Sequence, residues 1–430
     1  MAIWCLTIPI TANIGLFNVG STEITISRLL GMFLVGIVSI LVFFIRPGRI
    51  PALPLAFIII FLIYLFAHVF FGSEIFASFL IFIRAYGAFC ILILFLSNTS
   101  FKLVHFTNKA LVVIGAATAI YTIVQLLVLK IDPAFAYKLF GKEQFWGGGD
   151  NVIRPMGILL SAGGSASLIC IALVVLIKRW ELEGLSIANK ILFVILLVGL
   201  LCNFTRTFIL MFALYGAVIL LYYKRFSRLI TLAFLGLVVV SSYVSYVGVE
   251  KVMSRFQDVP SFSQEKVDDH RAFEGRGLLI EILLSDFQKQ DSISKLIGNE
   301  LNWSGKSIQK YYKHNFRVET GEASAHNDYI WLLVNLGYIG LLLYLLLAFN
   351  LYKMNKYEHS IFYRLFIVLM FIGAGFGGES IAITGHRYFQ MLLIANMYNE
   401  DRLKATEPMK KIGQKKTRAT LFNYNSQNTA

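Results

Sequence analysis

Residues 321–340 read GEASAHNDYIWLLVNLGYIG and pass from a polar loop into an apolar run. The apolar part continues after Gly340 as LLLYLLLAF, so it is long enough to cross a bilayer, whose hydrocarbon core takes about 20 helical residues. Three polar side chains, His326, Asn327 and Asp328, stand where the loop becomes the run. The stretch therefore predicts a membrane helix with an imidazole, an amide and a carboxylate at its mouth.

Similar apolar runs recur along the whole chain. Hydrophobic residues make up 57% of the 430 residues and charged residues only 15%, whereas a soluble protein carries about 25% charged residues. We predict an all-α polytopic membrane protein with about 11–12 transmembrane helices. The expected spans are residues 1–20, 26–45, 50–71, 75–97, 109–129, 155–177, 187–205, 206–223, 228–248, 328–352, 361–378 and 381–398. Pro9, Thr11 and Asn13 interrupt the first of these spans, which makes it the weakest.

Basic residues gather in alternate connections between the spans, and such connections face the cytoplasm. This pattern explains the net charge of +14 without nucleic acid, and it predicts that both termini are cytoplasmic. It also places the long polar segment 249–327 outside. We therefore expect four parts, which are an N-terminal transmembrane bundle (1–248), a large external loop (249–327), C-terminal transmembrane helices (328–398) and a basic, disordered cytoplasmic tail (399–430).

The external loop contains one amphipathic pattern. In RGLLIEILLSDF, residues 276–287, apolar residues recur near the helical spacing. This pattern predicts a helix that lies on the membrane surface or caps the bundle.

Unusual ionisable residues gather on the external side of the predicted spans. They are Arg154, Arg206, Arg271, Arg276, His326 and Arg387. An ionisable group at the edge of a membrane span is costly and suggests function. Guanidinium groups match phosphate oxygens in a bidentate manner, and a histidine accepts a proton near neutral pH. Together they indicate transfer of a group from a diphosphate to a hydroxyl at the outer leaflet.

Each residue also has a purely structural explanation. A boundary arginine such as Arg154 can reach lipid headgroups, and Arg276 can do so from an amphipathic helix. Asn327 or Asp328 can cap the helix that follows. The carboxylates of EKVDDH, residues 265–270, do not make a ligand set, and the four cysteines have no metal-binding spacing, so we expect no metal and no cofactor.

Four motifs resemble the O-antigen ligase and O-antigen polymerase superfamily of bacterial inner-membrane proteins. They are RPMG at 154–157, TRTFIL at 205–210, GRGLLIEILLSDF…LIGNE at 275–300 and AHNDYIWLLVNLGYIGLLL at 325–343. The His-Asn pair followed by Gly337 and Gly340 is the most specific of them. The chain departs from the family with LLSAGGS after the first motif and with GNE at 298–300.

The resemblance implies a metal-independent membrane glycosyltransferase of the inner membrane whose active site faces the periplasm. By position, His326 resembles the catalytic base, and Arg206 and Arg276 resemble catalytic ligands of the diphosphate. Arg154, Arg271, Asn327, Asp328 and Arg387 are the expected substrate-binding residues, and Asn327 and Asp328 are expected to fix the position of His326 rather than to do chemistry. Gly337 and Gly340 are expected to let their helix pack closely against a neighbour.

The implied donor is a glycan on undecaprenyl diphosphate, held among membrane lipids. We favour a polymerase of O-antigen or capsular repeat units, in which the acceptor is the sugar of another lipid-linked unit and a chain-length regulator is a further partner. A ligase would transfer the glycan to lipid A core instead. A transporter of lipid-linked sugar is a third interpretation, but such proteins usually carry internal repeats, and none is evident here.

Overall fold

A computed structural model describes most of the apolar part of the chain. The described residues are 15–19, 22–25, 50–72, 75–97, 100–141, 145–147, 153–158, 162–227, 230, 241, 276–311, 327–376 and 387–406. The expected spans 26–45 and 228–248 lie outside these residues, except for Ile230 and Ser241.

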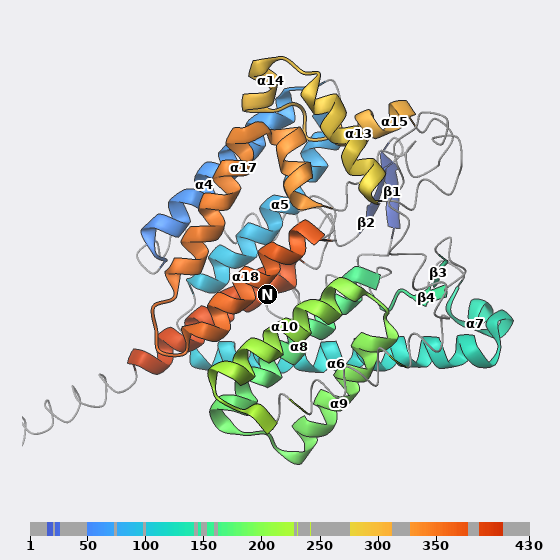
Figure 1. Cartoon of the computed structure of the whole chain (residues 1–430), viewed down its shortest axis with the longest axis vertical. Coiled ribbons are helices and arrows are strands. Elements are labelled where there is room, and N and C mark those ends of the chain that lie inside the picture. Colours follow the sequence, from blue (N-terminus) through green and yellow to red (C-terminus); the bar gives the residue numbers. More distant parts are fainter. Residues whose placement is uncertain are drawn as a thin grey trace, which may run out of the picture.

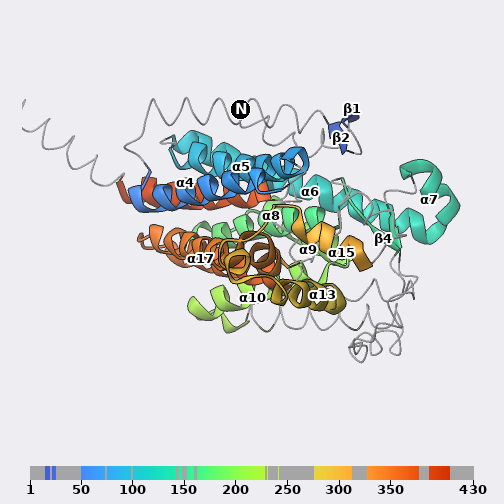
Figure 2. The same ribbon diagram turned by 90° about the horizontal axis from the view of Figure 1, so that it is seen from above.

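The described chain is a bundle of apolar helices with a group of short helices against one end (Figures 1 and 2). The bundle comprises α4 (Ala52–Ala67) with the 3-10 turn η3 (His68–Phe70), α5 (Ile75–Leu96), α6 (Phe101–Ile131), α8 (Ala162–Glu183), α9 (Ile187–Cys202), α10 (Arg206–Tyr222), α17 (Asp328–Met354) and α18 (Ser360–Phe376). A last helix, residues 387–406, is named the C-terminal helix here.

The helices have the length and the composition of membrane spans. Ala52–Phe70, Phe101–Ile131, Ala162–Glu183 and Asp328–Met354 are long and apolar enough to cross a membrane, and four shorter helices are similarly apolar. Large apolar side chains such as Ile63, Val113 and Leu342 are more than half exposed, which suits a surface in contact with lipid. The predicted fold class, an all-α polytopic membrane protein, is therefore confirmed.

Polar residues set several helix ends. The Ser100 hydroxyl accepts a hydrogen bond from the Leu103 N–H and caps α6. Asp132 ends α6 and caps α7 (Pro133–Phe140), because its carboxylate accepts hydrogen bonds from two N–H groups. Pro133, at the first position of α7, has no N–H group that would need an acceptor. Side-chain capping thus turns the chain sharply at the end of α6.

Two short strand pairs lie outside the bundle. β1 (Gly15–Val19) pairs antiparallel with β2 (Thr22–Thr25), and β3 (Phe145–Gly147) pairs with β4 (Ile153–Pro155). The first expected span, 1–20, is therefore wrong at its C-terminal end, where a strand replaces the helix. The other end of the chain also differs, because the C-terminal helix runs to residue 406 and so continues past the boundary expected at 398.

Three short helices of the polar segment pack on the start of α17. They are α13 (Arg276–Gln288), α14 (Ser292–Ile297) and α15 (Trp303–Tyr311). Leu279, Leu283 and Phe287 of α13 are buried in a cluster with Val334 of α17. The amphipathic helix expected at 276–287 is present, and it buries its apolar face against α17.

Asp291 fixes the beginning of α14. Its carboxylate accepts from the Ser294 hydroxyl and from the backbone N–H groups of Ile293 and Ser294. These hydrogen bonds, the one from the Ser294 hydroxyl first, lower the pKa of Asp291 below its ordinary value. The cap therefore stabilises α14 above the ordinary pKa of an aspartate, and its contribution is lost as the pH falls through the lowered pKa.

A break at Gly337 divides α17 into two arms. Gly337 has φ 67° and ψ −173°, a left-handed conformation that L side chains rarely adopt. Residues 328–336 are called the first arm and residues 338–354 the second arm. The break removes the partners of the carbonyl oxygens of residues 334, 335 and 336, which an unbroken helix would bond to residues 338, 339 and 340.

Other parts of the protein supply the missing donors. The Asn299 side chain donates to the Val334 oxygen at 3.0 Å, and the Asn299 backbone N–H donates to the Asn335 oxygen at 2.7 Å. The Tyr64 hydroxyl of α4 donates to the Leu336 oxygen at 3.0 Å. Each freed carbonyl is therefore satisfied, as an irregular backbone within a membrane protein requires.

The two arms fold back against each other. The rings of Tyr329 in the first arm and Tyr344 in the second lie 6.5 Å apart between centroids. In a continuous helix the same residues, fifteen positions apart, would be separated by about 22 Å along the axis. Figure 1 shows the two parts of α17 side by side, so the first arm runs back along the second arm.

Gly337 and Gly340 have the close-packing role expected for them. A Cβ on Gly337 would lie 2.5 Å from the Gly298 nitrogen, and one on Gly340 would lie 3.1 Å from the Tyr64 ring. Gly337→Ala should therefore destabilise the protein by about 2–5 kcal/mol, of which about 1–2 is the left-handed backbone and about 1–3 is overpacking. Thermal unfolding in detergent measures this effect.

Gly184→Ala is the matched control, because Gly184 also has a positive φ (79°) but a Cβ there would meet no atom within 4 Å. It should lose only the backbone part, about 1–2 kcal/mol. Equal melting temperatures for the two variants would contradict the close contact at Gly337.

Candidate active site

Contacts between helices define two ends of the bundle. Asp328, at the start of α17, pairs with Arg387, at the start of the described C-terminal helix, and this end is called the Asp328 end. Lys178, near the end of α8, pairs with Glu400 and Asp401 of the same C-terminal helix, and this end is called the Lys178 end. Residues 387 and 400 are about 20 Å apart along a helix, so the two charged clusters are well separated.

The Asp328 end gathers the starts of several helices. Tyr215 of α10 and Tyr223, which directly follows α10, contact Phe362 near the start of α18. The Tyr329 hydroxyl, in contrast, donates to the Phe371 carbonyl near the end of α18 at 2.6 Å. The start of α10 therefore lies toward the Asp328 end. The first arm, α13 and the start of the C-terminal helix lie there too.

Asn327 caps the first arm. Its side-chain oxygen accepts hydrogen bonds from the backbone N–H groups of Tyr329 at 3.0 Å and Ile330 at 3.1 Å. Asn327 has an extended backbone, as an N-cap residue does. The capping role proposed from the sequence is therefore confirmed for Asn327, and its oxygen is occupied by the helix.

Asp328 and Arg387 form a buried ion pair. The Arg387 guanidinium donates to the Asp328 carboxylate, and it also donates to the Gln390 side-chain oxygen at 3.1 Å. Asp328 is fully buried and Arg387 is 5% exposed. Asp328 also lies in the first turn of α17, where the helix dipole favours a negative charge. Two residues expected to bind substrate are thus brought together and neutralise each other.

The predicted arginines stand at helix starts. Arg206 is the first residue of α10, and Arg276 is the first described residue of α13. A cation at the N-terminus of a helix is unfavourable for the helix itself, because the dipole is positive there. The same arrangement is favourable for an anion, since N–H groups and a guanidinium then attract it together.

The remaining predicted residues are less fully described. Arg154 lies in β4 opposite Trp146, but the environment of its side chain lies outside the described residues, as do those of Arg206 and Arg276. His326 and Arg271 lie outside the described residues altogether. Their roles remain predictions.

Two supporting residues were not found from the sequence. Tyr64 and His68 of the α4–η3 segment connect the break in α17 to the end of α14. The Tyr64 hydroxyl, which contacts the Leu336 carbonyl at the break, also donates to the Ile297 carbonyl of α14. The His68 Nε2 atom lies 2.9 Å from the Ile297 carbonyl oxygen. The His68 Nδ1 atom lies 2.8 Å from the Tyr64 carbonyl oxygen. A buried histidine in an apolar span was the signal available for finding this contact.

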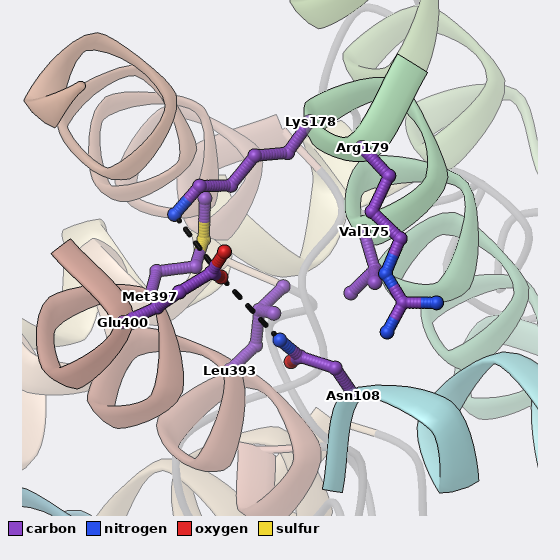
Figure 3. Close-up of a pocket in the computed structure, with 7 residues that line it drawn as sticks. All are labelled: Asn108, Val175, Lys178, Arg179, Leu393, Met397 and Glu400. Atoms are coloured by element: carbon purple, nitrogen blue, oxygen red, sulfur yellow. Dashed lines mark hydrogen bonds and ion pairs between the residues drawn. The ribbon is translucent and has the colours of Figure 1, made fainter. Parts of the chain in front are cut away.

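The Lys178 end has its own polar cluster, shown in Figure 3. Lys178 reaches Glu400 at 3.3 Å and Asp401 at 2.7 Å, and Asn108 of α6 donates to Glu400 at 3.4 Å. Lys178, Glu400 and Asn108 line a small pocket with Val175, Arg179, Leu393 and Met397. The opposite charges are paired, so the cluster joins α6, α8 and the C-terminal helix and accounts for the extension of that helix past residue 398.

The described residues include no group of three or more histidine, cysteine, aspartate or glutamate side chains placed to hold a metal ion. At the Asp328 end, the described residues place the capped first arm of α17 beside the start of the described C-terminal helix.

The described fold is that of a multi-pass membrane protein. Residues 191–345, less than half of the chain, match the family model described as O-antigen ligase. The match supports the O-antigen ligase and polymerase superfamily, and it covers three of the four motifs, all except RPMG at 154–157. It includes Arg206, Arg276 and His326, but not Arg154 or Arg387. No curated protein and no solved structure matches the chain.

The cap on the first arm gives a local prediction. Asn327→Ala removes the acceptor of two N–H groups and should cost about 1 kcal/mol, so that the amides of Tyr329 and Ile330 exchange about fivefold faster. Hydrogen exchange followed by mass spectrometry measures this rate.

Asn327→Asp keeps an acceptor oxygen and should exchange at the wild-type rate. Ser186→Ala, which removes the cap of α9, is the control and should leave exchange in the first arm unchanged. Faster exchange in the aspartate variant as well would show that the amide acts through something other than capping.

Proposed function

We propose that the protein polymerises lipid-linked glycan repeat units of an O-antigen or a capsular polysaccharide. The donor is a glycan on undecaprenyl diphosphate, and the acceptor is a sugar hydroxyl of another lipid-linked unit. The observation that carries this proposal is the first arm of α17, whose Asn327-capped start is folded into the bundle directly after His326 in the chain. The match to the O-antigen ligase family supports the class of reaction.

The proposed reaction is a single displacement. The acceptor oxygen attacks the anomeric carbon of the donor sugar, and the bond from that carbon to the phosphate oxygen breaks. The lipid diphosphate leaves with the electron pair, and the hydroxyl proton passes to the His326 imidazole. A diphosphate is already a good leaving group, so the protein mainly has to hold the reactants and to neutralise the developing charge.

The arginines divide this work by position. Arg206 begins α10, so it adds a guanidinium to the positive end of a helix dipole and suits the diphosphate. Arg276, the first described residue of α13, is the second proposed ligand of the diphosphate. Arg154 and Arg271 are proposed as further ligands of the substrate. The proposed mechanism requires no metal and no cofactor.

The ligase reaction is the second candidate, because the matching family model is described as O-antigen ligase. It uses the same donor and the same charge pattern but transfers the glycan to lipid A core. A polymerase would work with a chain-length regulator as an additional partner. The glycans that accumulate in cells lacking the protein distinguish the polymerase from the ligase, because loss of each enzyme leaves a different product.

The base assignment predicts the outcome of His326→Ala. The variant should reach the wild-type level in the membrane, whereas long glycan chains should disappear, because no other group takes the hydroxyl proton. Glycan ladders on gels, from a deletion strain that carries each variant, measure this loss. Single-unit capped products would indicate a lost polymerase, and unattached polymer on its lipid carrier would indicate a lost ligase.

His359→Ala is the control, because His359 lies between α17 and α18 at the Lys178 end, where the nearby Asn355 donates to Asp401. Its ladder should match that of the wild type. Long chains at wild-type abundance in His326→Ala would reject the base assignment.

The proposed site faces the periplasm, with both termini in the cytoplasm. A single cysteine at Lys289, whose side chain is 68% exposed just after α13, should react with an impermeant thiol reagent in intact spheroplasts. A cysteine at the exposed Lys190 of α9 should react only after lysis. The reverse pattern would overturn the orientation derived from the basic residues.

A further inference from the structure

The Asp328–Arg387 pair is poorly suited to hold the anionic donor. A guanidinium that binds a diphosphate must be reached by it, yet Arg387 is 5% exposed and its charge already faces a carboxylate. A carboxylate beside the diphosphate would also repel it. The pair therefore has a different use from the arginines at the starts of α10 and α13.

The pair belongs to a chain of contacts across three helices. Asp328 lies on the first arm of α17, and Arg387 and Gln390 lie on the C-terminal helix. The Gln390 side-chain nitrogen then donates to the Ser167 hydroxyl of α8 at 3.3 Å. Ser167 and Gln390 are both buried, so the chain of contacts is enclosed within the bundle.

The first arm needs such a hold at its beginning. At its other end the first arm is linked to the second arm through Gly337, where the helical hydrogen bonds are interrupted. Asn299 and Tyr64 hold the arm near Gly337. At its beginning, the ion pair of Asp328 and the hydrogen bond from the Tyr329 hydroxyl to the Phe371 carbonyl tie the arm to other helices.

We propose that Asp328 and Arg387 are positioning residues that fix the start of the first arm, and thereby the preceding His326, against α8 and the C-terminal helix. This inference rests on the proposed function, in which His326 is the base. In this proposal Asp328 and Arg387 bind each other and not the substrate, and their ion pair determines the position of the base.

Purified protein in liposomes, supplied with lipid-linked repeat units, tests the proposal by kinetics. Asp328→Asn should lower kcat by about 100-fold and change the KM for the donor by less than about threefold, because misplacement by about 1 Å costs that much in rate without removing a ligand. The acidic limb of the pH profile should move to lower pH, since a negative charge near the base is lost. Arg387→Lys should keep more activity than Arg387→Ala.

The exchanged pair, Asp328→Arg with Arg387→Asp, should recover at least about tenfold over either single change, because the contact is restored in reverse. Asp401→Asn is the matched control. It also removes a buried carboxylate from an ion pair, with Lys178, but at the other end of the bundle. It should lower the melting temperature while leaving the pH profile unchanged.

A second readout does not depend on catalysis. A cysteine replacing His326, in a background without other cysteines, should change its rate of reaction with a maleimide by at least about tenfold when Asp328 is changed to Asn, because local opening alters exposure. An inactive wild-type protein would reject the proposed function, whereas the thiol rate would still test positioning. An unchanged thiol rate, or a raised KM with an unchanged kcat, would overturn the positioning role.

Discussion

The break in α17 at Gly337 is the constraint on which the rest of the structure depends. It frees three backbone carbonyls inside a membrane protein, where water is not available to satisfy them. Asn299, from the segment after α14, and Tyr64, from α4, supply the donors. The break is therefore stable only when the polar segment 276–311 is docked on the bundle. Gly298 and Gly337 permit this docking because they have no Cβ. A Cβ on Gly298 would overlap the backbone of Leu336, and a Cβ on Gly337 would overlap the backbone nitrogen of Gly298.

The same break links the fold to the proposed chemistry. By folding back, the first arm carries its capped start into the bundle, where Asp328 meets Arg387. An unbroken helix would place residues 327 and 328 far from the C-terminal helix. The polar segment thus does two things: it satisfies the break, and it brings α13, which begins with Arg276, to the end of the bundle where the arm starts. The Lys178 end secures the opposite end of the C-terminal helix through paired charges.

The sequence predicted the elements better than their contacts. Apolar runs located α4, α5, α9, α10 and α18, because burial in lipid selects composition over a whole span. The amphipathic pattern located α13, and the His-Asn motif located a capped helix start.

The fold-back at Gly337 was not predicted, because hydropathy is the same for a straight and a broken helix. The pairing of Asp328 with Arg387 joins residues 59 positions apart, and no local pattern encodes it. The end of the last helix was also missed, since Glu400 and Asp401 resemble tail residues until their partner Lys178 is known.

Cross-linking between the two arms of α17 tests the fold-back most directly. Cysteines would replace Tyr329 and Tyr344 in a background without other cysteines, and the membranes would be treated with a bifunctional thiol reagent of short span. The fold-back predicts efficient intramolecular cross-linking, because the two rings lie 6.5 Å apart. A continuous helix would hold the two positions about 22 Å apart, beyond the reach of the reagent. Absence of the cross-link, with both thiols shown to be reactive, would contradict the fold-back and the site built on it.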